Sequence, residues 1–505
     1  MTARASAGSF WDEDFAWAPP PGFVPPERAF DITVETEPAV AIPIHRPRAP
    51  SGRRVRLQPA RFLSRAGLPL LVLALLVVAA LWAFGGPEQR AATLAKPKPA
   101  ATTTPLPESV APGAVNEPIA MGDRGKAVRA LQQTLIALGV GAPGADGSFE
   151  GATRDAVFAF QQAHGLTADG VVGPETTEAL RGALAERSTS EAADTREGLR
   201  TAVGAKRLSA EAGSQYEAIL DRALEGYGDM PLAGAANLSV VLGSVASQSS
   251  AYDEPRALAL FGMLEANREH LKTNEPPEKP TDITGADGVV YRFFPARGFQ
   301  FHPLANFAAL NRHVSKGRSA EARRLATALV ARAVPDGKAR VWEYYFPFGG
   351  PSRWTSGFAQ AVAADALSRT GVLVHDPKLG DAAKAAFLAI PNGLSRRIGG
   401  GSWVREYGFS DIVILNAQLQ TTLNISRFAK TSGDAEARAF AAALETASRS
   451  LLPRFDKGCW SLYSLGGGNA PPAYHRYHIR LLGQLAAQDA GGPWREVARR
   501  WQASC

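Results

Sequence analysis

Residues 146–173 read DGSFEGATRDAVFAFQQAHGLTADGVVG, and an Asp-Gly pair stands near each end of this stretch. Between the two pairs, apolar residues recur at helical spacing and lead to Phe160-Gln161. A glycine after aspartate supplies the positive φ of a tight turn, and nearby threonine or aspartate side chains can cap the start of a helix. The stretch therefore predicts a turn, a helix and a second turn.

The same pattern continues on both sides of this stretch. Upstream, Gly122-Asp123-Arg124-Gly125 leads into a helix that carries Val128 and Leu131 on its apolar face. Downstream, a third helix carries Leu180. We therefore predict a small three-helix domain over residues 118–184.

Several short motifs in this domain resemble the three-helix peptidoglycan-binding domain of many bacterial wall enzymes. They are Val-x-x-Leu-Gln, Asp-Gly-x-Phe, Ala-Val-x-x-Phe-Gln and Gly-Leu-x-x-Asp-Gly-x-Val-Gly, in that order along the chain. The resemblance implies non-catalytic attachment to peptidoglycan or another cell-wall glycan. The alternative is a spacer domain that binds no ligand.

An apolar run lies upstream of this domain. Residues 66–87 carry no charge, and a membrane-spanning helix needs roughly 20 apolar residues. Because arginines accumulate before the run, we expect the N-terminus to stay in the cytoplasm and the rest of the chain to cross the membrane. A cleaved signal peptide is the alternative to a retained anchor. The arginines are Arg46, Arg48, Arg53, Arg54, Arg56, Arg61 and Arg65.

Composition separates the segments around this predicted membrane span. Residues 1–65 are rich in proline, arginine and acidic residues without periodicity, which predicts a disordered cytoplasmic tail. Residues 88–117 are rich in proline, threonine and alanine, which predicts an extended linker. Much of the net charge of +7 lies beside the apolar run, so it does not indicate nucleic acid as a partner, although a positive balance would also suit an anionic glycan. The apolar run itself predicts a lipid bilayer as a partner.

The two cysteines, Cys459 and Cys505, either pair or remain isolated thiols.

The rest of the chain, residues 195–505, is dominated by helical periodicity. A hairpin is predicted where Ala286-Asp287-Gly288 separates two short runs, one of them Val289–Phe294. Successive helices at this spacing predict a mainly α fold in which paired helices form an α/α toroid-like domain. The predicted helices cover 216–224, 235–247, 254–271, 304–315, 318–333, 355–371, 380–389, 411–430, 434–450 and 473–488.

The C-terminal third also gathers phenols, carboxylates and imidazoles, the groups that move protons. Its motifs resemble the C-terminal domain of D-glucuronyl C5-epimerases over residues 299–505, although Ala417 and Ser464 replace a glycine and an aspartate of the family pattern. The resemblance implies proton removal at C5 of a uronate and its return on the opposite face. The motifs are Phe301–Asn306, Trp354–Gln360, Glu406-Tyr407 with Leu415-Asn416, Ser461–Leu465, and Tyr474–Ile479 with Gln484-Leu485.

The resemblance also implies which residues act. It places tyrosines in the catalytic role, and Glu406 is an alternative base. Since free tyrosine has a pKa of about 10, a tyrosinate base needs a nearby cation. The predicted catalytic residues are Tyr407, Tyr463, Tyr474 and Glu406. The predicted substrate-binding residues are Arg405, Trp354, Gln360, Asn416, His475, Arg476 and His478.

Some of these residues have an alternative role. Trp354 is either a sugar-stacking platform or a packed wall, and Gln360 is either a ligand or a solvated helical side chain. His475 and His478 bind substrate, make structural hydrogen bonds or form half of a metal site. No metal and no cofactor are predicted.

These expectations combine into one hypothesis. The chain is predicted to be an epimerase of a uronate-containing polysaccharide, anchored in a bacterial cytoplasmic membrane with its C-terminal domains outside and attached to the cell wall. A polysaccharide lyase on the same scaffold is the second hypothesis, since it begins with the same proton abstraction. A non-catalytic wall-glycan binding protein is the third. The sequence leaves open which polysaccharide is used and the oligomeric state.

Overall fold

A computed structural model describes residues 118–141, 144–228 and 230–503. This part of the chain is mainly helical, with a few small antiparallel sheets. Within it, no helix is both long and apolar enough to cross a membrane. The predicted tail (1–65), membrane helix (66–87) and linker (88–117) all lie outside the described residues.

The predicted three-helix unit is present, and its two turns are built alike. Gln132 donates from Nε2 to Asp146 Oδ1 at 2.8 Å and accepts the Gly147 N–H at 2.8 Å. Gln161 repeats this arrangement with Asp169 and Gly170, both at 2.9 Å. Leucine, valine and phenylalanine side chains fill the core between the helices. The helices are α2 (Lys126–Ala137), α3 (Gly151–Ala163) and the start of α4 (Pro174–Gly204).

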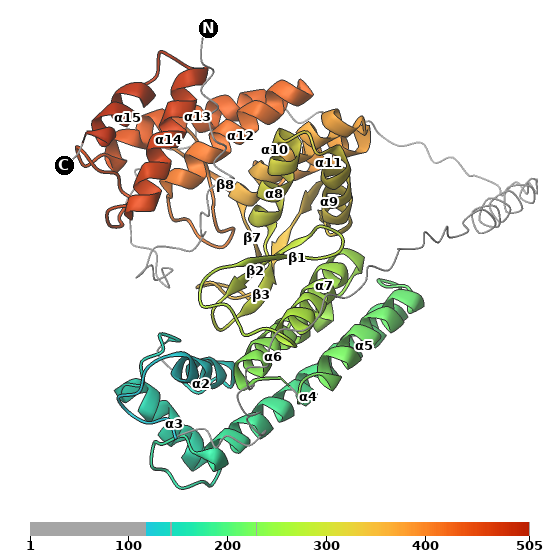
Figure 1. The fold of residues 1–505 in the computed structure, drawn as a ribbon. Coiled ribbons are helices and arrows are strands. Elements are labelled where there is room, and N and C mark those ends of the chain that lie inside the picture. Colours follow the sequence, from blue (N-terminus) through green and yellow to red (C-terminus); the bar gives the residue numbers. More distant parts are fainter. Residues whose placement is uncertain (1–117, 142–143, 229, 504–505) are drawn as a thin grey trace, which may run out of the picture. The chain divides into compact units, whose positions relative to one another are not determined.

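The last helix of this unit does not stop at its edge. α4 runs without interruption through residue 204, across the predicted boundary between 184 and 195, and packs against α6 (Figure 1). α2 also packs on α6, where Asn237 Nδ2 donates to the buried Gln133 Oε1 at 3.0 Å. The helices that follow α4 are α5 (Ala210–Glu225), α6 (Leu232–Ala246) and α7 (Glu254–Leu271), with a 3₁₀ turn, η2, at Ser249–Ala251.

The predicted hairpin is present and carries a third strand that was not predicted. β1 and β2 pair antiparallel, and β2 pairs with β3 so that Arg292 lies opposite Gln300. The Asn306 side chain bonds both the N–H and the C=O of Val290 at 2.7 Å, which ties the sheet to the next helix. The strands are β1 (Asp282–Thr284), β2 (Val290–Phe294) and β3 (Gly298–Phe301).

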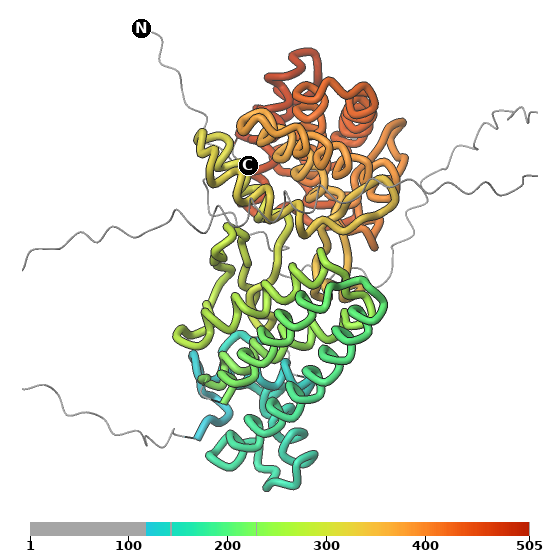
Figure 2. The backbone as a smooth tube through the Cα atoms, turned by 90° about the vertical axis from the view of Figure 1, so that its right-hand side faces the viewer, coloured from blue at the N-terminus to red at the C-terminus, as the bar shows by residue number. Residues whose placement is uncertain are grey.

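Helix pairs make up the rest of the chain, and Figure 2 follows them from yellow to red. Side chains of His302, Ser356 and Asp434 accept backbone N–H groups and so cap three of the helix starts. The most extensive packing is between α10 and α11, between α10 and α12, and between α12 and α13. The helices are α8 (Pro303–Ser315), α9 (Ser319–Ala331), α10 (Gly357–Val374), α11 (Pro377–Leu388), α12 (Leu415–Ser432), α13 (Ala435–Phe455), α14 (Pro472–Gln488) and α15 (Trp494–Gln502).

Short hairpins connect the helices, and none of these was predicted. In these hairpins the chain is extended near residues 344, 354 and 404, whose side chains are buried. The last helix, α15, was also not predicted; it packs against α14 and buries Trp494 and Trp501. Cys459 is disulfide-bonded, which favours the paired alternative for the cysteines. The strand pairs are β4 (Val334–Asp336) with β5 (Ala339–Val341), β6 (Glu343–Tyr344) with β7 (Trp354–Thr355), and β8 (Ser395–Ile398) with β9 (Gly401–Val404).

Candidate active site

The segment after β9 carries two of the predicted catalytic residues. The Gly357 N–H donates to Arg405 O at 2.9 Å, and the Gly408 N–H donates to Thr355 O at 2.8 Å, so the segment is held at both ends. A Cβ at Gly357 would lie 2.5 Å from the carbonyl oxygen of Leu394, so only glycine allows this approach. Between the two contacts, Glu406 and Tyr407 are 1% and 2% exposed.

The Arg405 side chain lies outside this interior and is partly exposed, because the chain bends directly after β9. Its guanidinium pairs with Asp411 at 2.9 Å and donates to Gly393 O at 3.0 Å. The structure therefore does not bring the Arg405 side chain beside Glu406 in the way that the predicted carboxylate-binding role requires.

Tyr463 and Tyr474 reach the same interior from two other segments. The Leu415 N–H donates to Tyr463 O at 3.1 Å, which fixes the Tyr463 loop against α12. Tyr474 lies on the first turn of α14, and its ring meets that of Tyr463 edge-on at 4.9 Å. Both side chains are buried.

Tyr344 completes the group from β6. Its ring stacks on Trp354 at 4.0 Å, while its neighbour Glu343 pairs with Arg256 on the opposite face of the strand. We call Glu406, Tyr344, Tyr407, Tyr463 and Tyr474 the acid–phenol cluster. Its members come from four segments that are distant in sequence.

The electrostatics of the cluster keep the phenols protonated. Burial, and then the charge of Glu406, raise the pKa of Tyr463 and Tyr474 above the usual value. The same two causes raise the pKa of Tyr407 well above its usual value, and a hydrogen bond from Tyr463 lowers it only in part. The groups that shift these three pKa values are Glu406 and neighbouring tyrosines, so the cluster presents neutral phenols around the Glu406 side chain.

One side of the cluster is covered by an aromatic wall, formed by Tyr344, Phe346, Phe348, Trp354 and Phe409. Trp354 is its centre: it contacts the Tyr407 ring at 5.6 Å and donates from Nε1 to Phe346 O at 2.9 Å. Because Tyr344 stacks on the indole and only 4% of Trp354 is exposed, the packing favours the wall over the sugar-stacking platform.

Two predicted binding residues are buried beside these elements with open hydrogen-bonding capacity. Gln360, on the first turn of α10, is 0% exposed, and neither its Oε1 nor its Nε2 has a partner among the described residues. Asn416, on the first turn of α12, is also buried, and its Oδ1 has no donor in the same part of the chain. Buried amide groups without partners are costly, so they mark positions that a bound ligand or water can satisfy.

The two predicted histidines hold the Tyr463 loop. Ser461 Oγ lies 2.9 Å from His475 Nδ1 and 2.8 Å from His478 Nδ1, and the Ser461 N–H donates to His475 Nδ1 at 3.2 Å. Because His475 Nε2 lies 3.2 Å from Trp501 O, this imidazole carries its proton on Nε2. The contacts favour the structural alternative for both residues.

Further observations concern the other predicted binding residues of α14 and the metal alternative. Arg476 is exposed on α14, outside the buried face that carries Tyr474. Burial lowers the pKa of His478 to about 3, so this imidazole is neutral. Among the described residues, no three histidine, cysteine, aspartate or glutamate side chains are grouped as metal ligands.

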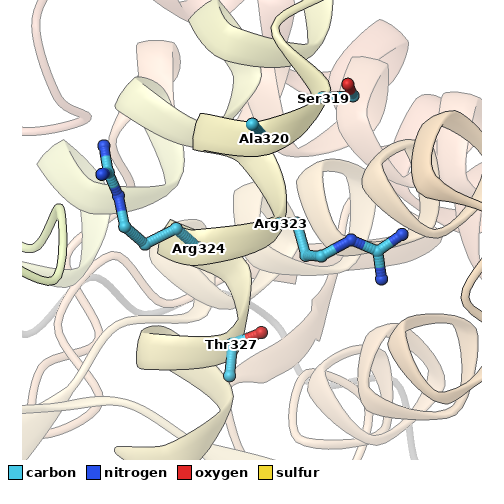
Figure 3. A pocket seen from close by; sticks show the side chains of 5 residues that line it. All are labelled: Ser319, Ala320, Arg323, Arg324 and Thr327. Carbon is cyan, nitrogen blue, oxygen red and sulfur yellow. The ribbon is translucent and has the colours of Figure 1, made fainter. Parts of the chain in front are cut away.

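A cavity of about 590 Å³ lies elsewhere, along α9 (Figure 3). Its lining includes Arg323 and Arg324, which point to opposite sides of the helix in Figure 3. Arg323 donates to Val374 O at 2.6 Å. No residue of the acid–phenol cluster lines this cavity, and its two cations do not converge on one point.

Sequence reasoning predicted a catalytic role for four of the five residues of the cluster and assigned none to Tyr344. The signal was the alternation in Trp342–Phe346, which places every second side chain on one face of an extended segment. That alternation alone does not say which face meets Glu406. The structure settles this point, since Glu343 and Tyr345 lie toward Arg256 and Tyr344 lies toward Trp354.

Comparison with known families confirms both resemblances. Residues 124–180 match the family described as putative peptidoglycan binding domain. Residues 336–503 match the family described as D-glucuronyl C5-epimerase C-terminus. The second match begins within β4 and ends after α15, so it contains every residue of the acid–phenol cluster.

Two individual proteins are similar to parts of the chain. N-acetylmuramoyl-L-alanine amidase CwlL of Bacillus licheniformis is 49% identical over 61 residues, which are 12% of this chain and 17% of the amidase. The chain thus spans under a fifth of the length of that relative. A GH8 endo-beta-1,4-glucanase from an Achatina fulica gut metagenomic library shares 15% identity over 44% of this chain and 74% of its own, with a TM-score of 0.34. At that TM-score the likeness supports no conclusion.

Proposed function

We propose that the acid–phenol cluster is a proton-transfer centre that inverts C5 of uronate residues in a polysaccharide. The observation that carries the proposal is the buried carboxylate of Glu406 among phenols from separate segments. Carboxylates and phenols are the acid and base groups that such a reaction needs. The match of residues 336–503 to the C-terminal domain of D-glucuronyl C5-epimerases supports the same chemistry.

In this proposal Glu406 is the base and the tyrosines are the acids. The Glu406 carboxylate removes the proton from C5, and the electron pair is delocalised into the uronate carboxylate. Phenol O–H donors that are already in place stabilise the negative charge that develops there. A phenol on the other face of the sugar then returns a proton to C5, which inverts the carbon.

The raised pKa values of Tyr463 and Tyr474 support this assignment of roles, because a protonated phenol is a donor at neutral pH. After one turnover Glu406 holds a proton and one tyrosine lacks one. Hydrogen bonds join Tyr463 to Tyr407 and to Tyr474, so a proton can pass among the tyrosines. After product release Glu406 gives its proton to solvent and the tyrosinate takes one from solvent, which restores both groups. The buried amides of Gln360 and Asn416 are the proposed contacts to sugar hydroxyls.

The remaining segments concern location and architecture. We propose that the three-helix unit binds peptidoglycan or another cell-wall glycan, which the family match and the likeness to the CwlL segment support. Residues 66–87 are proposed to anchor the chain in a bacterial membrane with the C-terminal domains outside, and the helix pairs are proposed to form an α/α toroid.

The test is solvent-isotope exchange. The full chain is incubated in deuterated water with a panel of uronate polysaccharides, and C5 is examined by NMR or mass spectrometry. Deuterium at C5 of an uncleaved chain is the expected result. An unsaturated product that absorbs in the ultraviolet would identify a lyase instead, and binding of the polymers without exchange would identify a non-catalytic glycan-binding protein.

A further inference from the structure

Arg297 is a half-buried cation without an anionic partner among the described residues, at the edge of the aromatic wall. Its Cζ lies 5.8 Å from the centre of the Phe346 ring. Within the part of the chain that the structure describes, no carboxylate lies within ion-pair distance of it, whereas the neighbouring Arg292 is held by Asp282 through two contacts of 2.7 Å. Burial lowers the pKa of Arg297, which is the expected sign for a cation that nothing neutralises.

The turn that presents Arg297 is held in place by specific contacts. Gln300 is 0% exposed and donates from Nε2 to Arg297 O at 2.5 Å. Its Oε1 is buried and has no donor among the described residues. Gln300 therefore holds the backbone of Arg297 in place and also carries a buried acceptor, Oε1, that is open to a ligand.

The backbone of the same turn is strained. Ala296 has a φ of 59°, in the left-handed region that a residue with a Cβ rarely adopts. Among the non-glycine residues of the described chain, only Lys206 and His375 share this feature. Such strain persists where the surrounding structure imposes it, and here it sets the position from which Arg297 extends over Phe346.

Ring contacts connect this position to the acid–phenol cluster. Phe346 lies 6.0 Å from Trp354, and Trp354 lies 5.6 Å from Tyr407. Arg297 is thus separated from Tyr407 by two rings. Phe346 also lies 6.0 Å from Tyr344, so one ring separates Arg297 from the edge of the cluster. A position beside the cluster, outside its group of phenols, suits an acidic group on a sugar that adjoins the reacting one.

We infer that Arg297 binds the carboxylate of a neighbouring sugar, outside the ring that reacts, and so makes the site selective for a polyanionic glycan. The planar guanidinium matches a carboxylate through two parallel hydrogen bonds, and Gln300 Oε1 is available to a sugar hydroxyl. The inference rests on the proposed function for the meaning of the reacting ring, but the anion site itself can be measured without turnover.

The test compares binding of a non-sulfated polyglucuronate with binding of its carboxyl-reduced form, by calorimetry on the full chain. We expect Arg297→Gln to weaken binding of the polyglucuronate about tenfold and to leave the carboxyl-reduced form unaffected. Arg297→Lys keeps the charge but not the planar fork, so an intermediate loss is expected.

Arg449→Gln is the matched control. Arg449 also lies over an aromatic ring, at 5.4 Å from Trp494, but it is paired with Glu445 and Asp489. This control should bind polyglucuronate as the parent chain does. Thermal unfolding of each variant identifies any loss of binding that comes from misfolding.

Turnover separates this inference from the proposed function. With Arg297→Gln, KM for long chains should rise about tenfold while kcat and the reaction of a single uronoside stay unchanged. A lower kcat with unchanged KM would overturn the inference, as would equal affinity of the parent chain and Arg297→Gln for polyglucuronate. If the parent chain shows no isotope exchange but still binds polyglucuronate through Arg297, the proposed function fails and the anion site stands.

Discussion

Three buried glutamines show how the three-helix unit and the C-terminal region differ in hydrogen bonding. In the three-helix unit, Gln132 and Gln161 are 0% and 1% exposed, and each uses both its oxygen and its nitrogen. In the C-terminal region, Gln360 is equally buried, yet neither of its polar atoms has a partner among the described residues. Satisfied amides build a fold, whereas an amide left open inside a core indicates a place for something else.

The same difference extends to charges. The carboxylates that bond Gln132 and Gln161 have a lowered pKa, first through the N–H groups of Ser148 and Val171 and then through the glutamine amides. Glu406 lies instead among phenols whose pKa values rise. In the three-helix unit these buried amides are matched to partners, whereas the C-terminal region holds buried amide atoms of Gln360 and Asn416 that have no partner among the described residues.

The largest expected effect comes from removing one phenol. Tyr474→Phe should reduce isotope exchange at C5 about 10²-fold or more, because one of the proposed phenol donors is lost. Binding of the polysaccharide, measured by calorimetry, should change little.

Tyr252→Phe is the control for this variant. It removes an equally buried hydroxyl, which donates to Val245 O at 2.8 Å outside the cluster. Exchange at the parent rate in Tyr474→Phe would remove this tyrosine from the mechanism.

The next effect tests the glutamine comparison directly. Gln161→Leu should cost about 3 kcal/mol, because it leaves the Gly170 N–H and three acceptors without their partner. Gln360→Leu loses no hydrogen bond to the described residues, so its stability should be unchanged or higher, while exchange activity should fall.

Hydrogen exchange over residues 146–173, together with denaturant unfolding of the full chain, measures both effects. Equal destabilisation by the two substitutions would mean that Gln360 has structural partners after all. In that case the contrast between the two regions would not hold.

A smaller effect concerns acid pH. His478 has a folded pKa of about 3 and takes up a proton near pH 6.5 when unfolded, so the unfolded state binds more protons between these values. Stability should therefore be constant above pH 6.5 and fall as the pH decreases, by about 2 kcal/mol at pH 5 from this residue alone.

His478→Asn should flatten part of this dependence in thermal unfolding measured between pH 5 and pH 8. A slope remains in the variant because burial also lowers the pKa of His302 well below its usual value. An unchanged slope in His478→Asn would contradict the neutral buried imidazole beside Ser461.

Sequence patterns predicted the contacts of the three-helix unit better than those of the C-terminal region, for a physical reason. The partners of Gln161 follow within Asp169–Thr176, so motif and contact coincide in one short stretch. The helix pairs of the C-terminal region were also predicted, because a helical period is local. Glu406, Tyr407, Tyr463 and Tyr474 were named through the family resemblance and do lie together.

What the sequence could not supply is the direction of side chains that meet across long separations. Arg405 and the adjacent Glu406 point in different directions, and so do Tyr344 and the adjacent Glu343. The local sequence pattern does not say which member of each pair faces the site. The open state of Gln360 and the position of Arg297 depend on several segments that converge only in the folded chain.

The central claim is that Glu406 is the base within a group of protonated phenols. Its most direct test is solvent-isotope exchange at C5 of a uronate polysaccharide by the parent chain and by Glu406→Gln, with thermal unfolding measured on both. We predict that the parent exchanges, and that Glu406→Gln exchanges about 10³-fold more slowly, because an amide cannot accept the C5 proton, while thermal unfolding shows that the variant is folded. Exchange by Glu406→Gln within a few-fold of the parent rate would contradict the claim and place the base elsewhere.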